Sequence, residues 1–210
     1  MKSVVRVALH AEPDQLQRLL DLRRTFAQVC NALVPLVQQT RTWNRVALHH
    51  MAYLQLRDAF PEMGSQMVCN AIYSVSRACR MVFQTPGSPL HHSRWVGKPM
   101  PRLHFHDTAP VYFDRHTLSI RGGQASMYTL DGRMKFELAL STEQETAFHE
   151  RRLLEVSLHR RGEAFELQFS FGTEDDPAAE PAPGHASRRR PPLMAANAPL
   201  PHYLSVEQPA

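Results

Sequence analysis

The spacing of the hydrophobic residues changes once along this chain, and that change limits the possible folds more than any other feature. From about residue 13 to 84 they recur every three or four positions, the period of helices that bury one face. From about 102 to 172 they alternate in short runs broken by turn residues, which is typical of antiparallel strands. A short alternating run at 3–9 precedes the helices. The sequence therefore predicts an α+β fold, with a strand, then helices, then further strands.

Three helices are predicted in the first of these regions. The first begins at Pro13, because proline is tolerated in a first helical turn, and is interrupted at 40–42. The second runs over about 44–60 and stops before Pro61. The third follows Gly64 and has the clearest helical period in the chain.

The rest of the chain divides by composition and turn signals. Strands are expected at 102–106, 111–113, 117–120, 126–130, 134–140, 153–159 and 164–171, with a short helix from 141 to 151. The last 38 residues hold 8 of the 16 prolines and are predicted to be a disordered tail. The resulting parts are a first strand (1–10), a helical lobe (11–85), a connector (86–101), antiparallel strands with one helix (102–172) and the tail (173–210).

Positive charge is concentrated before the tail. The chain has 24 basic and 20 acidic residues, and the tail holds three and five of these, so 21 and 15 remain in residues 1–172. Only three of the basic residues are lysines. Arginine offers a planar fork that suits phosphates and guanine edges, which favours a nucleic-acid partner. A GC-rich genome that encodes arginine in place of lysine explains the same composition.

Several classes of protein are not expected. No apolar run approaches the roughly 18 residues of a transmembrane helix, and the start of the chain lacks a secretory signal, so no membrane partner is predicted. Cys30, Cys69 and Cys79 form no CxxC pair, which argues against a zinc site and for a reducing cytoplasm. His104 and His106 lack a third ligand at motif spacing. No cofactor, metal or catalytic residue is predicted, since nucleophile and phosphate-loop motifs are also missing.

Two short motifs give the sequence a family resemblance. The run FPEMGSQMV (60–68) leads straight into the third predicted helix, and VYFDRHTLSI (111–120) is followed by LDGR (130–133). In this order the motifs resemble the N-terminal half of TnpB, a transposon-encoded RNA-guided nuclease that is similar to the type V CRISPR effectors. The resemblance covers about residues 3 to 172.

The resemblance implies both a fold and a function. The first strand and the later strands would form an antiparallel split β-barrel, the OB-like wedge domain, with the three helices inserted as a recognition lobe. Such parts grip a guide-type RNA and read a short motif in double-stranded DNA. The RuvC-type nuclease of the family would begin where this chain enters its tail, and the tail lacks the separated carboxylates that hold two metal ions. We therefore expect a non-catalytic nucleic-acid-binding protein, with any cleavage supplied by a separate nuclease subunit.

One side of the third helix is the predicted DNA contact. Opposite the apolar stripe, polar residues step by four and three positions and so share one side of the helix. They are Gln66, Asn70, Tyr73, Arg77 and Arg80. Amides can pair with an adenine edge, arginine can bind phosphate or guanine, and tyrosine can stack on a base. An ordinary solvated helix face has the same pattern, and the resemblance favours DNA because this helix matches the motif reader of the family.

The predicted RNA contacts fall into two groups. The link between the first two helices places an aromatic residue between two arginines, and comprises Arg41, Trp43, Asn44 and Arg45. The second group lies on or beside turns of the strand region and comprises Arg102, Arg115, His116, Arg121, Arg133 and Lys135. Stacking and charge would bind RNA at both. Alternatively, Trp43 belongs to the core, and the turn residues only solvate the surface.

Two other functions fit the same sequence. In the first, the protein is an interaction subunit that docks a partner through the helical lobe, along the leucine-rich stripe of its first helix. In the second, it is a truncated transposase remnant without activity.

Overall fold

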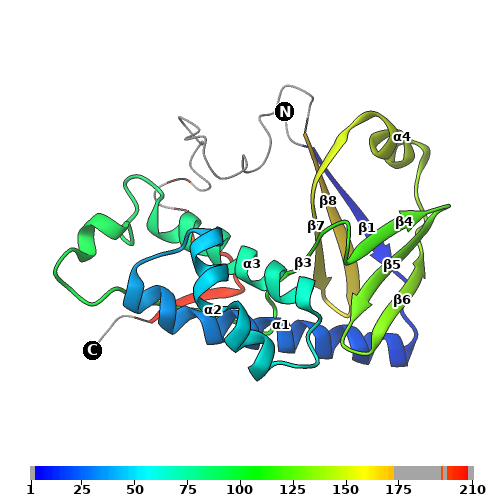
Figure 1. Cartoon of the computed structure of the whole chain (residues 1–210). Helices are drawn as coiled ribbons and strands as arrows, with labels where there is room; N and C mark the ends of the chain where they lie inside the picture. Colours follow the sequence, from blue (N-terminus) through cyan, green and yellow to red (C-terminus); the bar gives the residue numbers. More distant parts are fainter. Residues whose placement is uncertain (1–2, 173–194, 196–197, 208–210) are drawn as a thin grey trace.

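The structure, a computed structural model, describes residues 3–172, 195 and 198–207 (Figure 1). It confirms the α+β class. In chain order the elements are β1 (Ser3–Leu9), α1 (Pro13–Thr40), α2 (Arg45–Ala59), α3 (Ser65–Phe83), the 3-10 helix η1 (His92–Trp95), β2 (Arg102–Phe105), β3 (Val111–Phe113), β4 (Leu118–Arg121), β5 (Gln124–Thr129), β6 (Gly132–Glu137), α4 (Thr142–Glu150), β7 (Arg152–Arg161), β8 (Ala164–Gly172) and β9 (Leu204–Glu207).

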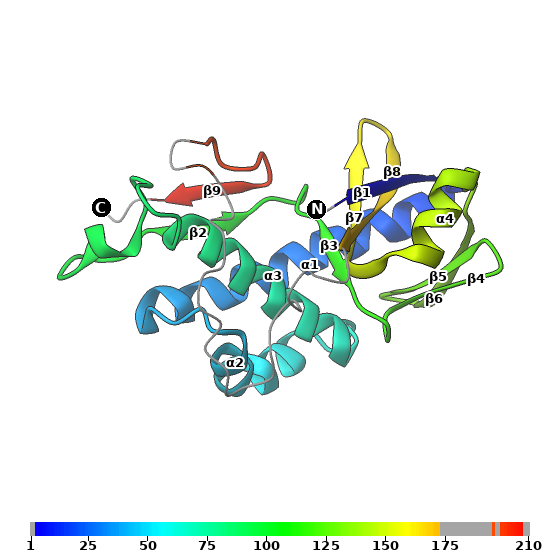
Figure 2. The ribbon, with the colours of Figure 1, turned by 90° about the horizontal axis from the view of Figure 1, so that it is seen from above.

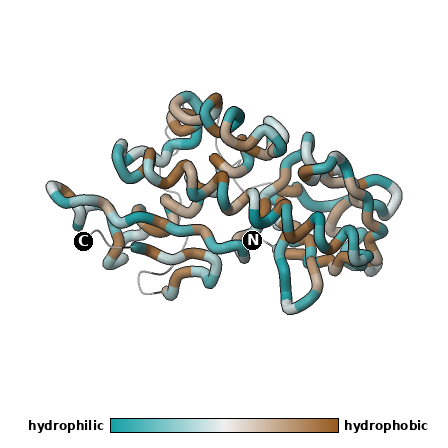
Figure 3. Tube along the Cα trace, turned by 90° about the horizontal axis from the view of Figure 1, so that it is seen from below, coloured by the Kyte–Doolittle hydropathy of each residue, from teal (hydrophilic) through white to brown (hydrophobic). Residues whose placement is uncertain are grey.

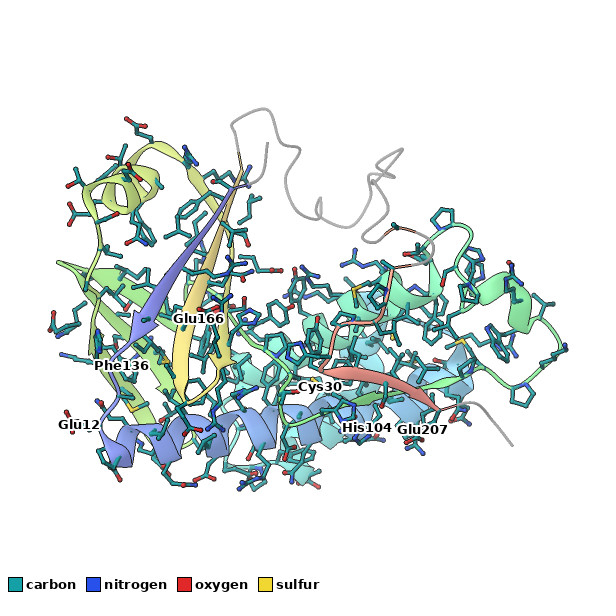
Figure 4. All side chains as sticks on the ribbon, turned by 180° about the vertical axis from the view of Figure 1, so that it is seen from behind. Glu12, Cys30, His104, Phe136, Glu166 and Glu207 are labelled. Carbon is teal, nitrogen blue, oxygen red and sulfur yellow. The ribbon has the colours of Figure 1, made fainter. Side chains whose placement is uncertain are left out.

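The three long helices begin and end where local sequence signals place them. A capping box at Glu12 and a proline in the first turn start α1, which ends at Arg41 in the left-handed conformation with φ 54°. The Asn44 side chain caps α2 by accepting from the backbone N–H groups of Val46 and Ala47. The helices pack on one another, and Cys30 on α1 is fully buried among them (Figure 4).

The described strands form three antiparallel sheets. The largest has the order β1-β8-β7-β3, the second has the order β4-β5-β6, and the third pairs β2 with β9. In the largest sheet Val7 lies opposite Leu167, and Leu167 lies opposite Leu158, and all three are buried. Hydrophobic and hydrophilic residues are interspersed along the trace (Figure 3), and on β5, β6 and β8 buried positions alternate with more exposed ones, which gives these strands an apolar face to bury.

The two larger sheets share a core without closing into a barrel. Phe148 of α4 packs against Phe169 and Phe171 of β8, with ring centroids 4.8 and 5.2 Å apart. Met134 and Phe136 of β6 belong to the same hydrophobic cluster. No strand pair among the described residues joins one of these sheets to the other. The predicted antiparallel strands are therefore present, and they form separate sheets.

The C-terminal segment corrects one prediction. The tail was expected to be disordered over 173–210, but β9 pairs with β2, and Leu204 lies opposite Phe105 with only 5% of its surface exposed. A short apolar run lies within a segment whose average composition is rich in proline and alanine, and a strand edge far back in the sequence binds it. Residues 173–194 lie outside the described residues.

The helix α1 connects the two ends of the molecule. The β2-β9 pair lies beside the C-terminal end of α1, and the two larger sheets lie beside its N-terminal end (Figure 2). At β2, the Asn31 amide donates to the carbonyl of Phe105 and accepts from its N–H, both at 2.8 Å. The strand β2 is thus held by β9 on one side and by α1 on the other.

Candidate nucleic-acid interface

The outer face of the three-stranded sheet gathers polar and basic side chains. The strand register places Leu118, Met127 and Met134 side by side, and all three are buried on the inner face. Alternate positions therefore point outward. Together with the preceding turn they make up what we call the sheet surface: Arg115, His116, Ser119, Arg121, Gln124, Ser126, Tyr128, Arg133, Lys135 and Glu137.

The sheet surface is strongly basic. Its four cations, Arg115, Arg121, Arg133 and Lys135, are all exposed. Glu137 is the one carboxylate in the set, and it accepts a hydrogen bond from the Gln124 amide at 2.7 Å. A polyanion would therefore be attracted to this face.

An arginine and a tyrosine are stacked on the sheet surface, at the end next to the β5–β6 turn. The Arg133 guanidinium carbon lies 4.5 Å from the ring centroid of Tyr128, which is 41% exposed. The same guanidinium donates to the carbonyl of Ser126 at 3.0 Å and to that of His116 at 2.8 Å. These acceptors fix the guanidinium in place and carry no negative charge, so the cation is held without being neutralised by them.

The turn between β3 and β4 presents Arg115 and His116. The Asp114 carboxylate accepts from the N–H groups of His116 and Thr117, at 3.0 and 3.1 Å, and from the Thr117 hydroxyl at 2.9 Å. This is the local bonding that favours aspartate at the start of a turn. Both exposed side chains follow Asp114, and Arg115 Nε donates to Nε2 of His116 at 3.3 Å.

The helix α3 supports this turn from the inside. The Gln66 amide donates to the second carboxylate oxygen of Asp114, and the Asn70 amide donates to the Thr117 hydroxyl at 3.2 Å. Asn70 is only 5% exposed. Two residues that were predicted to contact DNA therefore position the turn that bears Arg115 and His116.

A second pair from the same row fastens α3 to the largest sheet. The Tyr73 hydroxyl donates to the Glu155 carboxylate at 2.7 Å, and Arg77 forms an ion pair with it at 3.2 Å. The Arg77 guanidinium carbon also lies 5.7 Å from the ring centroid of Tyr112. Burial, with Glu155 adding to it, raises the pKa of the Tyr73 hydroxyl, so this hydroxyl stays neutral and donates.

The prediction that this row of α3 forms an open face is therefore wrong. Gln66, Asn70, Tyr73, Arg77 and Arg80 are all buried or partly buried. The physical reason is that α3 packs against β3 as well as against α1 and α2, so both its apolar and its polar sides are covered. Asp114 accepts from Gln66, and Glu155 accepts from Tyr73 and Arg77. Asn70 donates to the Thr117 hydroxyl, which in turn bonds to Asp114.

The link between α1 and α2 is also engaged within the protein. The guanidinium of Arg41 donates to the carbonyls of Trp95 and Lys98. Trp43 is partly buried and packs against the core, with its ring centroid 5.8 Å from that of Phe83. Asn44 caps α2, as described above, and the Arg45 guanidinium lies 5.6 Å from the Tyr73 ring centroid. Each of the four predicted side chains thus has a structural partner.

The structure brings together five of the ten predicted RNA contacts. Arg115, His116, Arg121, Arg133 and Lys135 share the sheet surface. Arg102 is separate, because it lies on β2 opposite Glu207 of β9, at the other end of α1 (Figures 2 and 4). The sequence reasoning missed Tyr128. Its position between the inward-facing Met127 and Thr129 would have identified it as an outward aromatic residue.

Other kinds of site have little support in the part of the chain that the structure describes. No three His, Cys, Asp or Glu side chains there are placed to hold a metal ion. Cys30 and Cys79 are buried, and burial raises the pKa of the Cys30 thiol to about 12. None of the helices described is long and apolar enough to span a bilayer.

Comparison with known proteins adds no family. The sequence matches no protein-family model, and no curated protein is significantly similar to it. The resemblance to TnpB thus depends on the motifs at 60–68, 111–120 and 130–133.

Proposed function

We propose that this protein binds nucleic acid through the sheet surface, with RNA as the principal ligand. The observation that carries the proposal is the exposed Arg133–Tyr128 stack, which shares one face of the sheet with three further cations. Charge would attract the phosphates, and the aromatic ring and the guanidinium would hold bases. Double-stranded DNA is a weaker candidate, because the helix predicted to read it has its polar side covered.

The resemblance to TnpB supports a more specific form of this proposal. In that form the two larger sheets are the halves of an open, OB-like wedge barrel, and α1 to α3 are a recognition lobe. The ligand is a structured guide-type RNA, and this chain binds it without cleaving nucleic acid. A separate subunit would supply the nuclease. Sequencing the RNA that co-purifies with the protein from its host tests this form: one enriched non-coding RNA supports it, and only ribosomal and transfer RNA contradicts it.

Charge reversal on the sheet surface tests the proposal itself. We would measure the affinity for a fluorescein-labelled RNA of about 20 nucleotides as a function of salt concentration. For single strands the logarithm of affinity falls with a slope of about −0.7 per phosphate contact, so four cations predict a slope of roughly −3. The double variant Arg121→Glu, Lys135→Glu is expected to bind at least about tenfold more weakly and to lose about 1.4 from that slope.

A matched control separates a binding surface from net charge. Arg94 and Lys98 are exposed on the connector, at the far end of the molecule (Figure 2). The control Arg94→Glu, Lys98→Glu changes the net charge equally and is expected to bind nearly as tightly as the native protein. Equal losses in the two double variants, or no RNA binding at low salt, would contradict the proposal.

A second candidate function is assembly with a protein partner through α2. Val46, Met51 and Leu54 are 47%, 39% and 80% exposed on this helix. The stripe of α1 that was predicted for docking instead lies in the core, where Leu19 and Leu22 are fully buried. In-cell crosslinking tests this candidate: a defined crosslinked species should disappear in Leu54→Lys and persist in the Arg121→Glu, Lys135→Glu variant.

A further inference from the structure

The stack on the sheet surface points to the form of nucleic acid that it binds. We infer that the sheet surface selects single-stranded over duplex nucleic acid by stacking an unpaired base on the Arg133–Tyr128 pair. This inference rests on the function proposed above. A base in a duplex has both faces covered by its neighbours, so only an unpaired base can present one to a protein ring or guanidinium. RNA and DNA strands share this chemistry.

The pair is built to receive a flat ligand. Arg133 and Tyr128 lie directly opposite each other on β6 and β5, and both are exposed. The 4.5 Å between guanidinium carbon and ring centroid is a stacking distance. Bonds to the carbonyls of Ser126 and His116 keep the guanidinium in this position before any ligand arrives. A fixed group loses little freedom on binding, which favours affinity.

The cations around the pair provide sites for phosphates. Lys135 follows Arg133 by two residues on the same face, about 7 Å along the strand. On the other side of β5, Arg121 ends β4, and the turn before β4 presents Arg115. A nucleic-acid strand with one base on the Arg133–Tyr128 pair would therefore have its phosphates within reach of cations on either side. The pair would contact the face of a base and the cations would contact phosphates, so we expect little dependence on base sequence.

Replacing the tyrosine ring tests the inference. The variant Tyr128→Leu removes the ring, and Tyr128→Phe keeps it without the hydroxyl. The ligands are a labelled 12-nucleotide RNA, the DNA of the same sequence, and the matching duplexes. We expect the native protein to bind either single strand at least tenfold more tightly than its duplex. Tyr128→Leu should weaken single-strand binding about tenfold at an unchanged salt slope, and Tyr128→Phe should bind like the native protein.

A ligand without bases gives a second measurement that does not depend on protein variants. An abasic deoxyribose-phosphate strand of the same length should bind the native protein about tenfold more weakly than the intact strand. On this ligand Tyr128→Leu should cause no further loss, since the ring then has no partner. Thermal unfolding followed by circular dichroism would verify that Tyr128→Leu is folded.

The outcomes separate this inference from the proposed function. If the Arg121→Glu, Lys135→Glu variant loses binding while Tyr128→Leu does not, or if single strands and duplexes bind equally, the surface acts through charge alone. The inference then fails and the proposed function stands. If neither change affects binding, both fail. A preference for the RNA strand over the DNA strand would identify the 2′-hydroxyl as a further contact.

Discussion

Two sets of residues with similar side chains make different contacts in this molecule. The row on α3 and the sheet surface are both made of arginine, tyrosine and amide side chains. On α3 the row meets carboxylates from distant segments, as when Glu155 of β7 accepts from Tyr73 and Arg77. On the sheet surface Arg133 meets carbonyls and a ring, and its charge faces solvent. Whether a row of arginines is paired within the protein or faces solvent therefore depends on whether a carboxylate lies opposite it. The composition of the row does not show which of these occurs.

Removing the acidic partner of the α3 row should have the largest effect on stability. The Glu155 side chain is 17% exposed, and Glu155→Ala leaves the Arg77 cation and the Tyr73 hydroxyl without their acceptor. Breaking a buried pair in this way costs about 3 kcal/mol. Urea unfolding monitored by circular dichroism measures the change in the free energy of unfolding.

The control for Glu155→Ala is an ion pair that is exposed to solvent. Glu163 pairs with Arg160 at 3.6 Å, but its side chain is 98% exposed. Glu163→Ala should therefore change the free energy of unfolding by less than about 0.5 kcal/mol. Similar values for the two variants would show that the α3 row does not fasten the helix to the sheet.

Loosening the support of the β3–β4 turn should have an intermediate effect. Asn70→Ala removes the hydrogen bond to Thr117 and is expected to cost about 1–2 kcal/mol. It should also weaken RNA binding a few-fold, because the turn that presents Arg115 and His116 is then less well fixed. Gln84→Ala, at the exposed C-cap residue of the same helix, should leave both quantities nearly unchanged. Full RNA affinity in Asn70→Ala would separate the α3 row from the sheet surface.

A smaller effect should appear as a pH dependence of stability. Burial lowers the pKa of His159 below its usual value of 6.5, and Ser157 lies 2.9 Å from its Nε2 atom. The unfolded chain therefore takes up this proton at a higher pH than the folded protein does. Stability is retained above pH 6.5 and falls as the pH drops below it. Unfolding at pH 7.5 and 5.5 should show a loss that is reduced in His159→Gln and retained in the exposed control His116→Gln.

Neutralising the sheet surface should affect stability least. Arg121→Ala with Lys135→Ala removes two exposed cations, so the free energy of unfolding should change by less than about 0.5 kcal/mol while RNA affinity falls. A thermal unfolding curve and the RNA titration together measure this contrast. A destabilisation as large as that of Asn70→Ala would mean that the surface has a structural role of its own.

Local signals in the sequence predicted the local structure well. Pro61, before which the second predicted helix stops, and Gly64, after which the third begins, placed α2 and α3 within a residue or two. Pairing between distant segments could not be predicted in this way, and β9 is the clearest case, because four residues join β2 from within a proline-rich stretch.

The candidate site could also be predicted only in part, because it too depends on contacts between distant segments. Turn residues are exposed wherever the turn lies, so Arg115, His116 and Arg121 were identified correctly as surface positions. A helical period distinguishes apolar from polar sides, but it does not reveal that a sheet covers the polar side of α3. The alternation along β5 could indicate that Tyr128 faces outward, but its position opposite Arg133 depends on the pairing of β5 with β6.

The pairing of β1 with β8 has a consequence for biosynthesis. Arg6 lies opposite Gln168, 162 residues further along the chain. A ribosome that adds about 5–20 residues per second leaves the N-terminal strand without its neighbour for roughly 8 to 30 s. The segments of α1 to α3 have emerged long before then, so the newborn chain would carry its helical region and an unpaired β1 strand that chaperones have time to bind.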